Sequence, residues 1–487
     1  MSTTLKNIKI PYPTEGVIRS AQLNDTVTPE NSVQLAINMN FDRVGAIQTR
    51  PGVETYATQR GGSITSFGAI NILGGSNVLF SQVGTDISVW FGGVWATVRT
   101  LSTGLYKARY SQWLNRTWMV NGSAGDPVMT SNGGAFSTSN VPNNPDTFPK
   151  GDFIQAGFDG RVWVANAALD ALYYTDIVQF NGTSYTAPLT FTASVNYIKW
   201  LSPQDGESIT GLFRIPRALL VFKQNHIYRV YSTSSVDPFP AYNVGTYSQE
   251  SIIQTKDGLY FHHSSGFYKF AYDGQPVEIS RRVIDFVRAI SRSNYGNVVG
   301  VYDGFDNVEW AVGSVTVEDV TYTNCVMRYT ISTQVWTIYD YPGNPITAMI
   351  RFDSTTSIKS LIGTLAGKVG ALDTGNTDFS ASIPYELIDR WRSFTEMYSK
   401  SKAISGIMVS AQNGGGTLLQ YQTEKAPANV WTDIDTLDEN YDSLFPNAST
   451  DDFNIVRLRL RGNSSGTPII VNGIELLSIQ DKGLNQN

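Results

Sequence analysis

The sequence has few of the residues from which metal and catalytic sites are most often built. It contains one cysteine, Cys325, and three histidines among 487 residues. A lone cysteine excludes an intramolecular disulfide, so we expect a buried thiol on a strand and stability that comes from packing. The histidines are His226, His262 and His263, and the adjacent pair would point to opposite faces of a strand. Because such a pair cannot chelate one ion without help from elsewhere, the sequence predicts no metal site and no cofactor.

Charge is also scarce. Charged residues make up 16% of the chain, and 36 basic residues stand against 42 acidic ones, for a formal net charge of -6. A nucleic-acid-binding domain would ordinarily carry a basic stripe and a basic isoelectric point, so a strong grip on DNA phosphates is not expected. No apolar run approaches the roughly 18 residues of a membrane-spanning helix, and the first residues lack a signal-peptide core. We therefore expect no membrane-spanning segment and synthesis in a cytoplasm.

The common catalytic signatures are missing as well. The sequence has no phosphate-binding Gly-Lys-Ser loop, no Gly-x-Ser-x-Gly elbow leading into a helix and no His-Glu-x-x-His. Several carboxylates near expected turns could form the acid pair of a glycan-cleaving enzyme, although Asp before Gly is also what turns require. These carboxylates are Asp257, Asp273, Asp303, Asp306 and Glu309. We therefore expect a non-enzymatic protein, with carbohydrate binding or glycan cleavage as the alternative.

Aromatic residues and glycine are abundant instead. Aromatics reach 12%, with 25 Tyr, 23 Phe and 10 Trp, and there are 43 Gly. Short aromatic or β-branched runs come in pairs around Gly- or Asn-containing turns, as in ISVWFGGVWATV (Ile87 to Val98) and VGVYDGFDNVEWAVG (Val299 to Gly313). Each such pair predicts a β-hairpin, and the chain is expected to be all-β.

The hairpins recur at a loose interval. The strand centres Trp118, Trp163, Phe222, Tyr260 and Trp310 are separated by 45, 59, 38 and 50 residues. One four-stranded propeller blade occupies about 40–50 residues. Both faces of these hairpins are apolar enough to lie between neighbouring blades, whereas a lone sandwich would expose one face. The pattern predicts a β-propeller of about six blades, with seven as the upper limit.

The spacing of the aromatic and β-branched runs divides the chain into three parts. Four prolines prevent long helices in residues 1–60, which are expected to form an extended N-terminal arm that suits reaching across to a neighbouring subunit. Residues 61–378 hold the propeller, and residues 379–487 predict a C-terminal β-sandwich-like domain. Within the last part, Val456 to Gly462 alternates strictly, which predicts one buried face and one solvent-exposed face. The exposed face would carry Arg457, Arg459 and Arg461, which are candidates for partner contact.

One helix is expected in this β-rich chain. SRRVIDFVRAISRSN (Ser280 to Asn294) has apolar residues at helical spacing, and Ser280 is an N-cap candidate. Asp285 could pair along the helix with a neighbouring arginine. Arg281, Arg288 and Arg292 would share one face, which is solvated, in contact with an acidic partner subunit or in contact with a DNA phosphate.

The stretch NMNFDRVGAIQTRPG (Asn38 to Gly52) holds two turns around a short strand. With the aromatic hairpins that follow, it resembles the start of the DNA-stabilising and tail-nozzle proteins (tail tubular protein B-like) of short-tailed bacteriophages, in which an Asn-Asp-Gly-Arg-Pro-Gly pattern precedes a β-propeller. The segments LLVFKQNHIYRVYS and DGLYFHHSSGFYKFAYDGQPVEIS also resemble mid-propeller blades of that family. The positions that match the family turn are Asp42, Gly45, Arg50, Pro51 and Gly52.

The resemblance implies a structural role for those five positions and a virion protein of the phage tail. Several copies, six in known relatives, would form a homo-oligomeric ring below the portal that helps to close the DNA exit channel and to attach portal, adaptor and tail-fibre proteins. Contact with genome DNA would be transient, because a weakly acidic wall does not hold phosphates tightly. The expected location is therefore the virion tail, after synthesis in the host cytoplasm.

Overall fold

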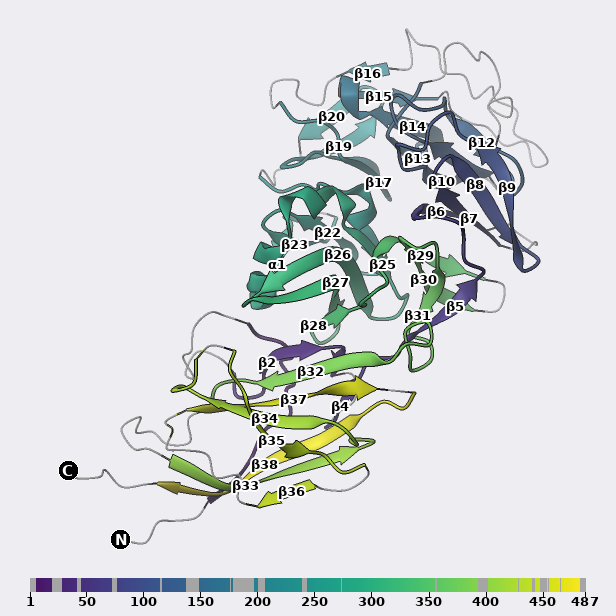
Figure 1. Cartoon of the computed structure of the whole chain (residues 1–487). Helices are drawn as coiled ribbons and strands as arrows, with labels where there is room; N and C mark the ends of the chain where they lie inside the picture. Colours follow the sequence, from purple (N-terminus) through teal and green to yellow (C-terminus); the bar gives the residue numbers. More distant parts are fainter. Residues whose placement is uncertain are drawn as a thin grey trace.

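The computed structural model describes most of the chain. The described residues are 6–19, 29–41, 45–71, 77–113, 116–136, 149–175, 177, 197–199, 206–238, 243–272, 274–354, 357–392, 402–427, 429–439, 443–446, 453, 455–464 and 466–481. Two β-rich bodies make up the molecule, and both include strands from the first sixty residues (Figure 1).

The larger body is a ring of seven antiparallel sheets within the described residues (Figure 1). The first strand of each sheet lies innermost, and neighbouring first strands contact one another around most of the ring. These strands are β6 (Ile64–Ile70), β10 (Arg109–Trp113), β13 (Phe153–Phe158), β17 (Gly211–Ile215), β21 (Ile253–Thr255), β25 (Val299–Tyr302) and β29 (Ile346–Asp353). Radial sheets around a common axis define a β-propeller.

Each first strand is followed outward by further strands of its own blade. The second strands are β7 (Val78–Val83), β11 (Arg116–Val120), β14 (Arg161–Asn166), β18 (Ala218–Phe222), β22 (Gly258–His263), β26 (Asn307–Val317) and β30 (Ile358–Thr364). The third strands are β8 (Asp86–Phe91), β12 (Met129–Ser131), β15 (Ala171–Tyr174), β19 (Ile227–Ser232), β23 (Gly266–Phe270), β27 (Val320–Thr330) and β31 (Val369–Leu372). Fourth strands within the same run of sequence are β9 (Val94–Thr100), β16 (Tyr197–Lys199), β20 (Ser235–Pro238), β24 (Val277–Glu278) and β28 (Val335–Asp340).

A strand from the beginning of the chain closes the ring. β5 (Val53–Ala57) pairs antiparallel with β31 and is the outermost strand of the seventh blade. Gly52 precedes β5, and its N–H donates to the carbonyl oxygen of Gly375 at 2.9 Å. A Cβ atom on Gly52 would lie 2.1 Å from the carbonyl oxygen of Thr377. Glycine is therefore needed where the closing strand approaches the backbone of the last blade.

Aromatic side chains fill the spaces between blades. Phe222 of β18 and Phe261 of β22 are fully buried, and their ring centroids lie 5.4 Å apart across the boundary of two blades. Trp163 and Trp310, two of the strand centres recognised in the sequence, are also fully buried. The hairpins are apolar on both faces because each blade packs against a neighbour on either side.

The smaller body is built from two sheets that share one hydrophobic core. One sheet holds β1 (Lys6–Lys9), β3 (Met39–Asn40), β4 (Ile47–Thr49), β33 (Lys402–Gln412), β36 (Ser443–Pro446) and β38 (Ile470–Asp481). The other holds β2 (Val33–Ile37), β32 (Ile383–Asp389), β34 (Leu418–Thr423), β35 (Thr432–Thr436) and β37 (Val456–Ser464). β2 also pairs in parallel with β28 at Ile37 and Ile338, so this sheet continues into the sixth blade.

The all-β propeller class is confirmed, with two corrections of detail. The ring has seven blades in the described residues, one more than the preferred six, because strand centres vary in spacing and the closing strand comes from outside 61–378. The first sixty residues do not form a separate extended arm. β1 pairs with β38, β2 with β32 and β4 with β38 in the same chain, since the C-terminal sheets offer open edges there.

The predicted helix is shorter than the sequence pattern suggests. Only α1 (Ile284–Ala289) is α-helical, between the 3₁₀ turns η3 (Arg281–Val283) and η4 (Arg292–Asn297). Ser280 does not cap it, because the Ser280 hydroxyl accepts the N–H of Phe267 at 3.0 Å. Ile290 is extended and ends the helix early. Short 3₁₀ turns also occur as η1 (Ala167–Leu169) and η2 (Gln249–Ser251), and no described helix is long and apolar enough to cross a membrane.

Substitution of Gly52 by alanine tests the closure of the ring. The added methyl group would force the closing strand away from Thr377, so we expect the free energy of unfolding to fall by about 1–3 kcal/mol in urea denaturation. Gly61→Ala is the matched control, because a Cβ there meets no atom within 4 Å, and it should change stability by less than about 0.5 kcal/mol. Equal effects of the two substitutions would show that the close approach at Gly52 does not constrain closure.

Candidate functional site

The stretch that carries the family resemblance builds the junction between the two bodies. Asn38 ends β2 with a left-handed backbone (φ 55°) and is completely buried. Its Nδ2 donates to the carbonyl oxygens of Asp340 at 3.1 Å and Pro384 at 2.7 Å. Its Oδ1 accepts the N–H of Asp340 at 2.9 Å and the Nε–H of Arg50 at 2.8 Å. The Asn38 side chain thus connects the sixth blade, the strand β32 and the turn that begins at Arg50.

Arg50 is the charged centre of this junction. Its side chain is fully buried and pairs with Asp378, whose side chain is 4% exposed. Nη1 and Nη2 donate to the two carboxylate oxygens at 2.9 and 2.5 Å, which is a bidentate geometry. The guanidinium carbon also lies 3.9 Å from the centroid of the Tyr341 ring, as expected for a cation–π contact. Each part of the guanidinium group therefore has a partner.

The remaining turn positions differ in how tightly they are held. Gly45 has a φ of 80° and open space around it, so it serves backbone geometry alone. The carbonyl oxygen of Pro51 accepts from Nη1 of Arg50 at 2.9 Å, and Gly52 makes the close approach already described. Asp42 lies outside the described residues. The described part of the motif is thus a structural joint.

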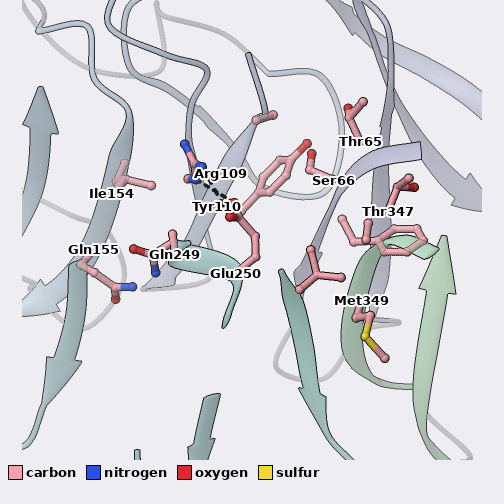
Figure 2. A pocket seen from close by; sticks show the side chains of 14 residues that line it. Thr65, Ser66, Arg109, Tyr110, Ile154, Gln155, Gln249, Glu250, Thr347 and Met349 are labelled. Atoms are coloured by element: carbon pink, nitrogen blue, oxygen red, sulfur yellow. Dashed lines mark hydrogen bonds and ion pairs between the residues drawn. The ribbon is translucent and has the colours of Figure 1, made fainter. Parts of the chain in front are cut away.

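The inner strands leave a small cavity on the propeller axis, of about 170 Å³ (Figure 2). Arg109 of β10 and Glu250 of η2 reach toward each other across it, with Nε and Oε1 2.8 Å apart. Nη1 of Arg109 also donates to the carbonyl oxygen of Asp152 at 2.9 Å, and the guanidinium carbon lies 4.5 Å from the centroid of the Phe153 ring. An ion pair therefore lines the axial cavity.

Electrostatics stabilise this axial pair. Burial alone would raise the pKa of Glu250, but the charges of Arg109 and Lys107 and the hydrogen bond from Arg109 lower it to about 2. Glu250 also accepts from the Ser248 hydroxyl at 3.1 Å. The sequence offered no signal for this pair, because its members lie 141 residues apart and neither belongs to a motif.

The arginines expected at partner surfaces fall into two groups. Arg281, Arg288 and Arg292 are exposed on and beside α1, where a neighbouring molecule could reach them. Their predicted partner role stays a prediction. The segment is not one continuous helix, because α1 ends at Ala289 before Arg292.

The arginines of β37 do not share a solvent-exposed face. Arg457 is buried between Trp391 and Trp431, with its guanidinium carbon 4.5 and 4.9 Å from the ring centroids. Burial lowers the pKa of Arg457 to about 10. Arg459 pairs with Glu386 at 2.5 Å, and Arg461 is exposed. The expectation of an exposed arginine face is wrong for Arg457, because flanking tryptophans that alternation cannot predict cover it.

Two of the three histidines and the cysteine are buried, whereas His226 is partly exposed and its Nδ1 lies 3.1 Å from Oε2 of Glu207. His262 and His263 occupy successive positions of β22, and burial lowers the pKa of His262 to about 3 and that of His263 to about 4. Cys325 is a buried free thiol on β27. Within the described residues, no group of three or more His, Cys, Asp or Glu side chains could hold a metal ion.

The carboxylates considered for catalysis serve different structural roles. Asp303 accepts three successive backbone N–H groups of its turn, and Asp257 pairs with Lys269 at 2.6 Å. Asp273 lies outside the described residues. Glu309 is inside β26 instead of at a turn, is 3% exposed, and lies 3.7 Å from Nη1 of Arg328. Its Oε2 has no hydrogen-bond partner, so the ionised form is poorly compensated.

Comparisons with known proteins give similarity at the level of fold. No family model and no curated protein sequence matches the chain. YCF48 from Cyanidioschyzon merolae is 13% identical, with a TM-score of 0.39, over 66% of this chain and 98% of that one. The Pan2 WD40 domain of Neurospora crassa is 7% identical, with a TM-score of 0.40, over 66% and 94%. An extracellular domain of a one-component system from B. thetaiotaomicron is 10% identical, with a TM-score of 0.41, over 90% and 64%.

Removal of Arg50 should destabilise the whole chain. Arg50→Ala leaves Asp378 buried without its charge partner, so we expect a loss of about 3–5 kcal/mol in equilibrium unfolding. Arg281→Ala, at an exposed position, is the control and should change stability by less than about 0.5 kcal/mol. A loss below about 1 kcal/mol for Arg50→Ala would contradict a central role for the pair.

Glu309 should make stability depend on pH. Burial, and then the charge of Asp373, raise the pKa of Glu309 to about 8, above its unfolded value. The contribution of protonated Glu309 to the free energy of unfolding is fully present below the pKa that this side chain has in the unfolded chain. It is lost as pH rises through the folded-state pKa of about 8. Glu309→Gln should therefore gain stability relative to the parent as pH rises from 5 to 9, measured by urea denaturation at each pH. A difference that stays constant over this range would refute a raised pKa, and Asp353→Asn, at an exposed site, serves as the control.

Proposed function

We propose that this protein is a non-enzymatic structural component of a short-tailed phage tail. In this proposal about six copies form a nozzle or adaptor ring that helps to close the DNA exit channel, retains packaged DNA and attaches neighbouring tail proteins. The observation that carries the proposal is the place of the Arg-Pro-Gly motif. Three of the five positions on which the family resemblance rests, Arg50, Pro51 and Gly52, lie in the joint between the propeller and the second domain.

A tail component has to transmit force between its neighbours without hinging. The contacts of Arg50 and Asn38 are joined by further contacts between the two bodies. β28 and β2 pair in one continuous sheet, Arg19 pairs with Glu318 at 2.7 Å, and Asn429 donates to the carbonyl oxygen of Glu318 at 2.8 Å. Glu318 lies at the tip of the long β26–β27 hairpin, which therefore braces the smaller body. This rigidity supports a role in assembly.

The small size of the axial cavity excludes it as a path for DNA in this proposal. A cavity of about 170 Å³, crossed by the Arg109–Glu250 pair, has no room for a duplex. In the proposed ring, DNA would run through the opening between subunits, where a net charge of -6 per chain disfavours tight phosphate binding. The exposed arginines on and beside α1 are candidates for the contact between neighbouring subunits.

A ring assay tests the proposal directly. Light scattering and electron microscopy of the purified chain should show discrete rings of about six copies. Replacing Arg281, Arg288 and Arg292 together by glutamate should weaken the rings, because the exposed charge is reversed, while circular dichroism stays unchanged. The same reversal at Arg217, which is exposed in the β17–β18 turn and outside every proposed contact, serves as the control.

A monomer at all concentrations, combined with release of reducing ends from a surface glycan, would overturn the structural role in favour of a glycan-cleaving one. Glycan binding without cleavage is the second candidate function. A cleft on one face of the propeller supports this second candidate.

A further inference from the structure

An open cleft of about 760 Å³ lies on one face of the propeller, between turns of the fifth and sixth blades and the end of β29 in the seventh. All turns from a first to a second strand lie on one face of the ring, because the first strands run in the same direction along the axis. The cleft is lined by Gln254, Thr255, Lys256, Tyr302, Gly304, Phe305, Asp306, Ser332 and Arg351. It is separate from the axial cavity, which has a different lining.

A rigid turn displays an aromatic ring in this cleft. Oδ1 of Asp303 accepts the N–H groups of Phe305 at 2.7 Å, Asp306 at 2.9 Å and Asn307 at 3.1 Å. The Tyr302 hydroxyl donates to the carbonyl oxygen of Phe305 at 2.9 Å. Despite this fixed backbone, the Phe305 side chain is 72% exposed. An aromatic ring held out to solvent by a fully bonded turn is a preformed contact for an apolar ligand face.

Two bases form the cationic part of the cleft. Arg351 of β29 lies with its guanidinium carbon 5.8 Å from the centroid of the Tyr302 ring. It packs so closely on the turn that a Cβ atom on Gly304 would come within 2.9 Å of that carbon. Lys256, in the β21–β22 turn, is exposed, and neither base forms a salt bridge with a described carboxylate. Both charges are therefore available to a ligand.

The acids near the cleft are already bonded within the protein. Asp306 accepts the backbone N–H of Ser332 at 3.0 Å and also accepts from the Ser332 hydroxyl. Asp257 pairs with Lys269 at 2.6 Å. The polar lining thus offers the amide of Gln254 and the acceptor side of the Ser332 hydroxyl, which suit a ligand rich in hydroxyl groups.

We propose that this cleft binds an acidic polysaccharide through one uronate unit. The sugar ring packs against the exposed Phe305, its carboxylate lies between Arg351 and Lys256, and its hydroxyls bond to the polar lining. A nucleic acid fits less well, because the two basic side chains of the cleft suit a single carboxylate, whereas nucleic-acid affinity rests on the neutralisation of several phosphates. The binding site gives the second candidate function a ligand class, and it does not depend on ring assembly.

Calorimetric titration of the purified full chain with a hexamer of galacturonate tests the site. We expect saturable binding that weakens with added salt, and no comparable binding of a neutral glucose hexamer. Arg351→Ala and Phe305→Ala should each weaken binding about tenfold or more. Arg351→Lys should retain part of the affinity, because lysine keeps the charge but loses the bidentate geometry. Arg281→Ala, outside the cleft, should bind like the parent.

Four results would overturn the proposal. These are no saturable binding up to about 10 mM, equal binding of the neutral hexamer, tighter binding of single-stranded DNA at the same salt concentration, or unchanged affinity in both cleft variants. The measurement is independent of the ring assay. A monomer that binds galacturonate through Arg351 would refute the ring and support the cleft, whereas a ring without binding would do the opposite.

Discussion

The buried pair between Arg50 and Asp378 is the interaction on which the architecture depends. It lies where the closing strand β5 enters the propeller, where β2 leaves the smaller body and where the sixth blade ends. A buried charge pair costs desolvation free energy unless its hydrogen bonds are complete, and here Asn38, Pro51 and Tyr341 supply the remaining contacts. Closure of the ring and attachment of the second body are therefore one structural event.

This joint explains why the chain crosses between its bodies near both ends of the propeller. Residues before β5 belong to the smaller body, β5 belongs to the last blade, and residues after β31 return to the smaller body through β32. The ring is closed by hydrogen bonds between distant segments, so opening one blade also disturbs the joint.

Much of the propeller could be predicted from the sequence, because hairpin chemistry is local. Paired aromatic strands such as Val299 to Gly313 follow from turn residues and alternation alone. The sequence predicted about six blades where the structure has seven in the described residues. One reason is that the closing strand β5 comes from a segment that has no aromatic hairpin of its own. Contacts between distant residues could not be predicted, because local sequence patterns do not encode them. Examples are the burial of Arg457 between Trp391 and Trp431, the pairing of Arg109 with Glu250 and the pairing of Arg50 with Asp378. Cleft residues such as Phe305 looked like ordinary turn neighbours for the same reason.

A double-mutant cycle between Arg50 and Asp378 tests the central claim most directly. If the two side chains stabilise the protein mainly through each other, Arg50→Ala and Asp378→Ala should each be costly, and the double variant should cost little more than either one, with a coupling free energy of about 2 kcal/mol or more. Losses that simply add, with coupling below about 0.5 kcal/mol, would contradict the claim and would leave the joint as two unrelated packing positions.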